Sequence, residues 1–465
     1  MNVAKLISDI DNILYTRCLI YLLLGAGIYF TLRTGFVQIR MLWDSVKCMT
    51  EKKCSDKGVS SFQALMIATA SRVGTGNMAG VATAIVIGGP GAAFWMWFIA
   101  VIGASSAFVE STLAQIYKRR DGDSFKGGPA YYIERALNAR RLSVFFAVSL
   151  IITFAIGFNG LQAYNIVSAF QCYTSDFEQS AIPLGIGAFL FIVSLFLFFG
   201  GTQKIGMVSS VLVPLMAIVY IIMGVWITVL NFSEIPAVFS TIFRSAFDFK
   251  SIFGGFSGSC LVYGIKRGLF SNEAGMGSAP NASASAEVSH PAKQGLAQTI
   301  SVYLDTLLIC STTVFILLLT GLYKTDPSLT GIPLLQQSIA TQFGSFSVHL
   351  ITVSVCLFAF TSIIGNYFYA ESNILFISRN PKVMTVFRIF AAVVVFFGAQ
   401  SNIDLAWHMA DLTMGIQAVI NIVAITLLSG IAFRALKDYE RQKKEGKNPV
   451  FKESNIGLTN TDVWK

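Results

Sequence analysis

The chain has 465 residues, of which 54% are hydrophobic and 13% charged, and its mean hydropathy is +0.64. Soluble domains carry about 25% charged residues, so this composition excludes an ordinary soluble protein and indicates one that lies in a lipid bilayer. The formal net charge of +9 raises nucleic acid as a partner, but the placement of the basic residues argues against it.

The apolar runs predict a bundle of membrane helices. Residues 1–17 are polar, and the run 18–32 predicts a first span; its flank, Asp9-Ile10-Asp11, is acidic where a cleaved signal peptide would be basic. Ten more runs are near or above the roughly 20 residues that a bilayer requires, and they lie at 59–88, 91–117, 143–171, 182–199, 204–230, 250–282, 294–321, 345–377, 382–399 and 402–433. We therefore expect an all-α integral membrane protein with about 11 transmembrane helices.

The basic residues lie mainly on one predicted side of the membrane. They concentrate in the linker 33–58, in 118–141 and from Arg434 onward. The positive-inside rule then predicts a cytoplasmic C-terminus, and an odd number of spans places the N-terminus outside. Basicity here reflects membrane topology, and we expect no nucleic-acid partner.

One short stretch, Ala70 to Gly80 (ASRVGTGNMAG), interrupts the second apolar run. Glycine destabilises a helix by about 1 kcal/mol, so Gly74 and Gly76 favour local unwinding. Broken backbone is tolerated at membrane depth only where it lines a cavity or binds something. The stretch therefore predicts a binding site.

A second stretch, Lys266 to Gly277, repeats the pattern of the first. Arg72, Asn77 and Ala79-Gly80 recur 195 residues later as Arg267, Asn272 and Ala274-Gly275, and Glu110-Ser111 falls at the same offset on Asp305-Thr306. We interpret this as an inverted repeat of five helices each, which is an architecture of secondary transporters. The expected divisions are 1–58 for an extra helix and basic linker, 59–230 and 231–433 for the two repeats, and 434–465 for a cytoplasmic tail.

A broken helix exposes N–H groups on one side of the break and carbonyl groups on the other. N–H groups suit a carboxylate and carbonyls suit a hard cation such as sodium, so a zwitterionic amino acid together with sodium would use both. We expect Gly74, Thr75, Gly76 and Asn77 to hold the carboxylate. From the second stretch, Gly268, Phe270, Ser271, Asn272 and Glu273 are expected to face the amino group and side chain.

Other polar groups within the spans leave two interpretations open. Hydroxyls such as Thr361 and Ser362 often bond back to their own helix, and Asn159, Gln162 and Asn165 could serve only to join helices. Glu110 and Asp305 are costly in lipid and are expected to face the interior, where pairing with Arg72 or Arg267 competes with a role in transport.

Several blocks are similar to the alanine or glycine:cation symporter family. They are Ser61-Phe62-Gln63-Ala64-Leu65, Arg72 to Asn77 (RVGTGN), Gly88 to Trp97 (GGPGAAFWMW), Gly127 to Glu134 (GGPAYYIE) and Arg267 to Gly275 (RGLFSNEAG). The resemblance implies sodium-coupled symport of small neutral amino acids, alanine or glycine, through a LeuT-like fold with one extra N-terminal helix, in a bacterial cytoplasmic membrane. It also implies a sodium site made by the carbonyls of Ala70 and Val73 with the hydroxyls of Thr361 and Ser362, and it keeps Gln162 as a candidate substrate contact.

Two other function classes have weak signals. Val73-Gly74-Thr75-Gly76 is similar to a potassium-channel filter, but a filter needs four such loops around one axis. Gly255-Phe256-Ser257-Gly258 is similar to an intramembrane serine protease, which also needs a histidine beside the serine. We expect a transporter rather than an enzyme.

Overall fold

The computed structural model describes residues 3–51, 59–122, 124–174, 176–200, 202–249, 252, 255, 259–326 and 328–465. Among these, eight helices are long and apolar enough to cross a membrane, namely Ile7–Arg33, Ala92–Ile116, Arg140–Tyr173, Ser209–Leu230, Pro291–Thr320, Phe346–Ile377, Pro381–Gly398 and Asp404–Lys444. Thr75–Gly88 and Ile182–Phe198 are shorter apolar helices. All-α membrane architecture is confirmed, while the number of crossings stays a prediction.

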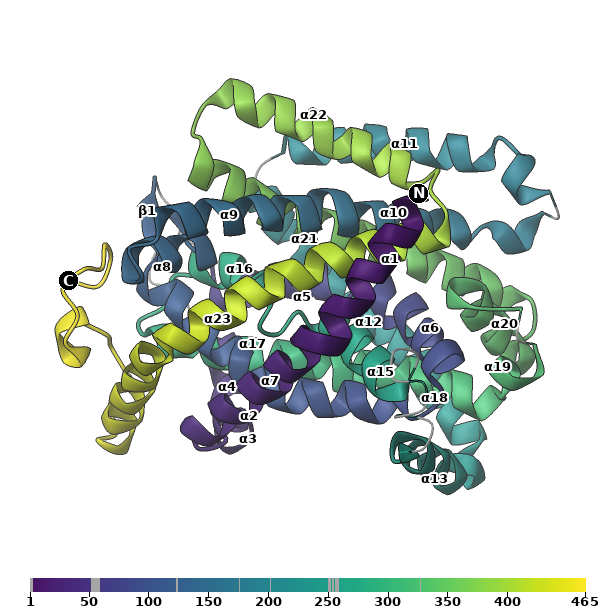
Figure 1. The fold of residues 1–465 in the computed structure, drawn as a ribbon, viewed down its shortest axis with the longest axis horizontal. Helices are drawn as coiled ribbons and strands as arrows, with labels where there is room; N and C mark the ends of the chain where they lie inside the picture. Colours follow the sequence, from purple (N-terminus) through teal and green to yellow (C-terminus); the bar gives the residue numbers. More distant parts are fainter. Residues whose placement is uncertain are drawn as a thin grey trace.

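The N-terminal segment is one long helix that starts earlier than predicted. It comprises α1 (Val3–Leu14), a π-helical turn (Tyr15–Leu19) and α2 (Ile20–Arg33), followed by the short helices α3 (Val37–Arg40) and α4 (Leu42–Met49). The first span was predicted at 18–32, because residues 1–17 look polar. Asp11 and Tyr15 are nevertheless buried, since α1 packs against α23 (Ile403–Lys444) as the two helices cross (Figure 1).

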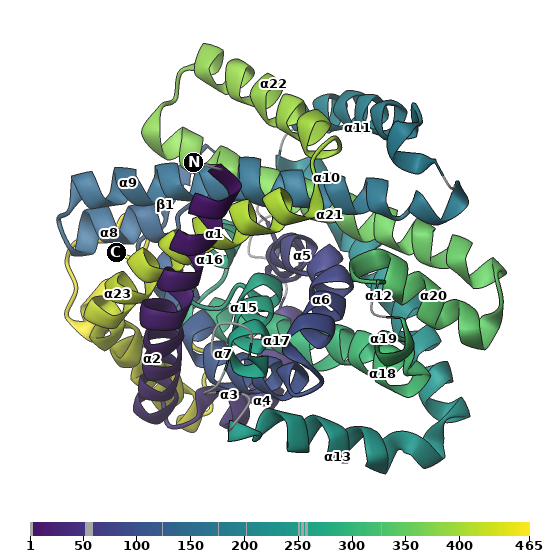
Figure 2. The ribbon, with the colours of Figure 1, turned by 45° about the vertical axis from the view of Figure 1, so that its right-hand side comes forward.

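Two broken helices lie at the centre of the bundle. The first consists of α5 (Ser61–Arg72), a single 3-10 turn (Thr75–Asn77) and α6 (Ala79–Gly88), and the second of α15 (Cys260–Asn272) and α16 (Ala279–Ser285). Each begins at a serine N-cap, Ser60 in a capping box with Gln63 and Ser259 accepting from the Val262 N–H. In Figure 2, α5, α6 and α15 are surrounded by other helices.

The helices around this centre supply its walls. On one side lie α7 (Ala92–Ile116) and α17 (Pro291–Tyr303), which contact α15 and α5 respectively, and on another lie α12 (Thr202–Leu230) and α21 (Phe346–Ile377). The α17 helix continues as a π-helical turn (Leu304–Cys310) and α18 (Ser311–Thr320). Proline stands in the first turn of several helices, including α17 and α22 (Pro381–Gly398), where its missing N–H costs nothing.

The remaining elements lie outside the centre. They are β1 (Arg119–Asp121) and β2 (Ser124–Lys126), which form an antiparallel hairpin, α8 (Pro129–Ala136), α9 (Arg140–Ile151), a π-helical turn (Ile152–Phe158), α10 (Asn159–Ser168), α11 (Ile182–Phe198), α13 (Ile235–Ala246), α19 (Leu322–Thr325) and α20 (Gly331–Phe343), with short 3-10 turns at Gln171–Tyr173, Phe177–Gln179, Phe232–Glu234 and Glu453–Ile456. Helix α23 continues unbroken past residue 433, so no helix end marks the predicted start of the tail.

Candidate functional site

The first break occurs where it was predicted. Helix α5 ends at Arg72, and the Gly74 N–H donates to the Asn77 side-chain oxygen at 2.9 Å. The Gly74 φ is −135°, a negative value that does not require glycine. A Cβ at Gly74 would instead lie 2.2 Å from the Ser362 Oγ, so glycine is needed here because a neighbouring helix approaches closely.

The second break lies within the predicted stretch Lys266 to Gly277, at its C-terminal end. Lys266 to Asn272 are helical, and the chain unwinds only at Glu273, with φ of 52°, and at Gly275 and Gly277, with φ of 84° and 85°. Positive φ strongly favours glycine, which explains why the chain turns at 275 and 277. Gly268 lies within α15, where a Cβ would meet Ile99 of α7 at 2.6 Å.

A candidate cation site lies beside the first break. The Ser362 hydroxyl of α21 donates to the Ala70 carbonyl at 3.0 Å and lies 3.5 Å from the Val73 carbonyl oxygen. Carbonyl and hydroxyl oxygens are suitable ligands for a sodium ion. Thr361 Oγ1 lies 3.0 Å from the carbonyls of Leu357 and Phe358 in its own helix. The structure therefore brings Ala70, Val73 and Ser362 together, whereas Thr361 bonds back to its own helix.

Helix α10 contributes a polar wall to the first break. Gln162 Oε1 accepts from the Thr75 N–H at 3.2 Å and from the Thr75 hydroxyl at 2.9 Å, while Asn165 donates to the same hydroxyl at 2.7 Å. Both side chains are buried. Gln162 and Asn165 thus join α10 to the unwound backbone at the first break.

Asp305 joins the two broken helices. Its carboxylate accepts from the Asn77 side-chain amide at 2.6 Å, from the Ser271 hydroxyl at 2.5 Å and from the Thr306 hydroxyl at 3.0 Å. Asn77 belongs to the first break and Ser271 to the last turn of α15. Asp305 therefore lies between the residues that were predicted to face the substrate.

The other two central carboxylates contact the second break. Glu110 of α7 accepts from the N–H groups of Gly275 and Gly277 at 3.2 and 3.1 Å and from the Asn421 side chain at 2.8 Å. Glu273 accepts from the Ser278 hydroxyl at 2.6 Å and from that of Ser71 at 2.8 Å. Asn272 turns back on the break, accepting from the Ala274 N–H at 3.0 Å.

Among the described residues, neither Glu110 nor Asp305 forms a direct ion pair with Arg72 or Arg267, the alternative to a transport role that the sequence left open. Arg72 is buried and donates to Gln298 Oε1 at 3.2 Å, and its Nε and Nη2 have no hydrogen-bond partner among the described residues. Arg267 forms a bidentate ion pair with Asp411, at 2.9 and 2.8 Å. The repeat offset gave no sign of that pairing, because Asp411 comes from α23.

Aromatic rings lie beside Gly76. The Phe270 ring centroid is 4.5 Å from that of Phe158 and 5.2 Å from that of Trp407, and a Cβ at Gly76 would lie 2.5 Å from the Phe270 ring. This arrangement leaves little volume between Phe270 and the first break.

The two weaker alternatives gain no support. Val73 to Gly76 form part of a helix break that α10 and α21 contact, rather than a loop on a pore axis. Ser257 of the protease-like motif lies outside the described residues.

Comparison with known proteins identifies the family. Residues 1–453 match the profile described as the sodium:alanine symporter family. The chain belongs to this family.

Curated members are similar over nearly their whole length. The chain is 46% identical to the amino-acid carrier protein AlsT of Bacillus subtilis, covering 97% of this chain and 95% of that protein. It is 45% identical to the probable sodium/glutamine symporter GlnT of the same organism, covering 95% and 91% respectively.

A solved structure shares the fold. The crystal structure of MhsT in complex with L-phenylalanine matches 89% of this chain and 94% of its own, with a TM-score of 0.54 and 15% identity. At that identity the likeness concerns the fold alone, and it supports the predicted LeuT-like architecture.

Proposed function

We propose that this chain carries small neutral amino acids, alanine and glycine, together with sodium by alternating access. Membership of the family makes it a sodium-coupled amino-acid symporter. The proposal adds three points to family membership. They are the choice of amino acid, a location in the cytoplasmic membrane and a cytoplasmic C-terminus.

The main support for the sodium site is that three oxygen atoms from two helices lie close together. The carbonyls of Ala70 and Val73 lie at the end of α5, and the Ser362 hydroxyl comes from α21. These groups would hold the ion, and the Thr361 hydroxyl would join them only by turning away from the Leu357 and Phe358 carbonyls of its own helix. Because both helices contribute, an ion bound there favours the arrangement in which they are close.

The substrate would occupy the region between the two breaks. The N–H groups from Gly74 to Asn77 suit its carboxylate, which would replace the Asn77 and Gln162 side-chain oxygens as the acceptor from Gly74 and Thr75. The Asp305 carboxylate, bonded to Asn77 and Ser271, suits its ammonium group. The ring of Phe270 beside Gly76 favours a small side chain. One relative is named as a probable sodium/glutamine symporter. Because we expect a small side chain beside Phe270, we do not expect glutamine to be the substrate of this chain.

Uptake of radiolabelled alanine into vesicles containing the purified chain tests the proposal. We expect uptake to rise with an inward sodium gradient and to be inhibited by unlabelled alanine and glycine more than by glutamine. Equal uptake with and without the gradient would contradict the coupling, and stronger inhibition by glutamine would contradict the substrate.

Two serine and threonine variants test the cation site. We expect Ser362→Ala to raise the half-saturating sodium concentration more than Thr361→Ala does, because Ser362 is the residue that contacts α5. The half-saturating alanine concentration at high sodium should change less. An unchanged sodium requirement in both variants would exclude this site.

A further inference from the structure

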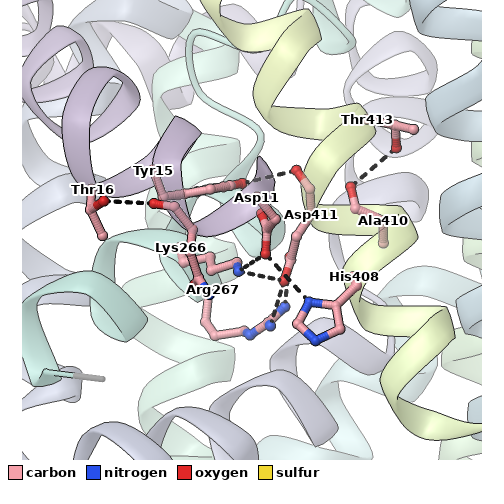
Figure 3. A network of polar contacts seen from close by, with 10 residues as sticks. Asp11, Tyr15, Thr16, Lys266, Arg267, His408, Ala410, Asp411 and Thr413 are labelled. Carbon is pink, nitrogen blue, oxygen red and sulfur yellow. Dashed lines mark hydrogen bonds and ion pairs between the residues drawn. The ribbon is translucent and has the colours of Figure 1, made fainter. Parts of the chain in front are cut away.

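A buried ion cluster lies outside the two breaks and joins three helices (Figure 3). We define it as Asp11 of α1, Lys266 and Arg267 of α15, and His408 and Asp411 of α23. Lys266 Nζ lies 2.5 Å from Asp11 Oδ2 and 3.0 Å from Asp411 Oδ2, and Arg267 pairs with both oxygens of Asp411. His408 Nδ1 lies 3.5 Å from Asp11 Oδ2.

Asp11 gives this cluster its charge balance. The side chains of Asp11, Asp411, Arg267 and Lys266 are 0%, 1%, 3% and 6% exposed. Two buried cations face two buried carboxylates, so loss of Asp11 leaves Lys266 and Arg267 to share Asp411 alone. Buried cations that outnumber their carboxylates are strongly unfavourable, so we expect Lys266, and with it α15, to rearrange around Asp411.

The cluster is connected to the candidate substrate site through the same helix. The Arg267 guanidinium lies over the Trp407 ring at 3.9 Å, and the Trp407 ring contacts that of Phe270 at 5.2 Å. Phe270 and Ser271 follow Arg267 within about one turn of α15. Any shift of α15 at Lys266 therefore also moves Phe270, which lies beside Gly76, and Ser271, which donates to Asp305.

We propose that Asp11 is a positioning residue for transport: through Lys266, the extra N-terminal helix holds α15 in the position at which Phe270 and Ser271 bind the amino acid. The inference rests on the proposed function. It assigns a role in substrate affinity to a helix that contributes no residue to either break.

The test compares charge-neutralising variants on α1 and α15 in sodium-driven alanine uptake. Asp11→Asn should raise the half-saturating alanine concentration about tenfold, because Lys266 and Arg267 must then share Asp411 in a buried site. Asp9→Asn is the matched control on the same helix, since Asp9 is exposed, and it should leave that concentration unchanged.

Rescue of alanine affinity by a second substitution distinguishes a positioning role of Asp11 from a role in stability alone. In the double variant Asp11→Asn/Lys266→Met the pair is removed as a whole and Arg267 keeps Asp411, so affinity should return to within about threefold of the wild type. Asp11→Glu should also retain most of the affinity. Where Asp11→Asn yields no folded protein, Lys266→Met, which leaves Asp11 without its cation, takes its place.

Three results would overturn the proposal. They are a wild-type alanine affinity in Asp11→Asn, whether or not its thermal unfolding midpoint is lowered, an affinity in the double variant no better than in the single variant, and an affinity in Asp9→Asn reduced as much as in Asp11→Asn. Absence of sodium-driven uptake in the wild-type protein would instead contradict the proposed function. The wild-type measurement therefore distinguishes the two failures.

Discussion

Position 74 requires glycine because a Cβ would have no room there, and not because the backbone takes a conformation that only glycine can adopt. The φ of −135° is open to other residues, but Ser362 Oγ lies 2.2 Å from the position of a Cβ, and Gln162 Nε2 lies 3.0 Å from it. From the sequence, Gly74 was expected only to favour unwinding. The close approach of α21 does not follow from the residues that neighbour Gly74 in the chain.

Gly74→Ala should therefore reduce alanine uptake by about tenfold or more, since overpacking costs roughly 1–3 kcal/mol and would separate α5 from α21. Gly430→Ala is the control, because a Cβ at Gly430 meets nothing within 4 Å. Initial uptake rates measure the effect. Equal rates in the two variants would show that the contact with Ser362 is unimportant.

His290 provides a prediction about pH. It precedes α17, its Nδ1 accepts from the Ala292 N–H at 3.1 Å, and burial lowers its pKa below the usual value. The unfolded chain then binds a proton more readily than the folded one, so this contribution to stability is present above about pH 6.5 and is lost as pH falls through the lowered pKa.

We expect the thermal unfolding midpoint to fall between pH 7 and pH 5, and His290→Asn, which keeps a capping side chain, to reduce that fall. His349→Asn, at an exposed position, should keep the wild-type pH dependence. The same pH dependence in all three proteins would contradict the role of His290.

At the scale of elements, each broken helix is contacted by a carboxylate from the opposite half of the chain. Glu110, on the helix after the first break, accepts from Gly275 and Gly277 in the second, and Asp305, on the helix after the second break, accepts from Asn77 in the first. This reciprocal arrangement supports the inverted repeat that the offset of Glu110 and Asp305 predicted.

Glu110→Gln tests this arrangement. An amide directs its NH₂ group at one of the two N–H donors, which leaves a buried donor unsatisfied at a cost of about 1–3 kcal/mol. We expect a lower unfolding midpoint and slower alanine uptake. Glu440→Gln, which removes a surface ion pair with Arg40, should change the midpoint little, and an equal effect of the two variants would contradict the role of Glu110.

At the scale of the whole molecule, coupling to sodium sets a limit on accumulation. One sodium ion crossing 100 mV yields about 2.3 kcal/mol, and a tenfold gradient adds about 1.4 kcal/mol, which together support roughly 500-fold accumulation for one ion per substrate. The steady-state alanine ratio in vesicles under these conditions measures the stoichiometry. A ratio far above this limit would require a second coupled cation.

The sequence by itself determined the features that depend on local composition and spacing. Apolar runs predicted the membrane helices. Gly74 lies at the first break, and Gly275 and Gly277 lie at the second. These breaks follow from the sequence because unwinding depends on residues within a few positions. Blocks such as Gly88 to Trp97 were long enough to indicate the family.

Only the tertiary structure decided which side chains meet. Arg267 pairs with Asp411, and Ser362 rather than Thr361 contacts α5. Asp11, in a segment that was predicted to be polar and to precede the first span, is buried beside Lys266. The physical reason is common to all three. Each partner comes from a helix far away in the chain, and the burial of a charge or hydroxyl depends on how whole helices pack.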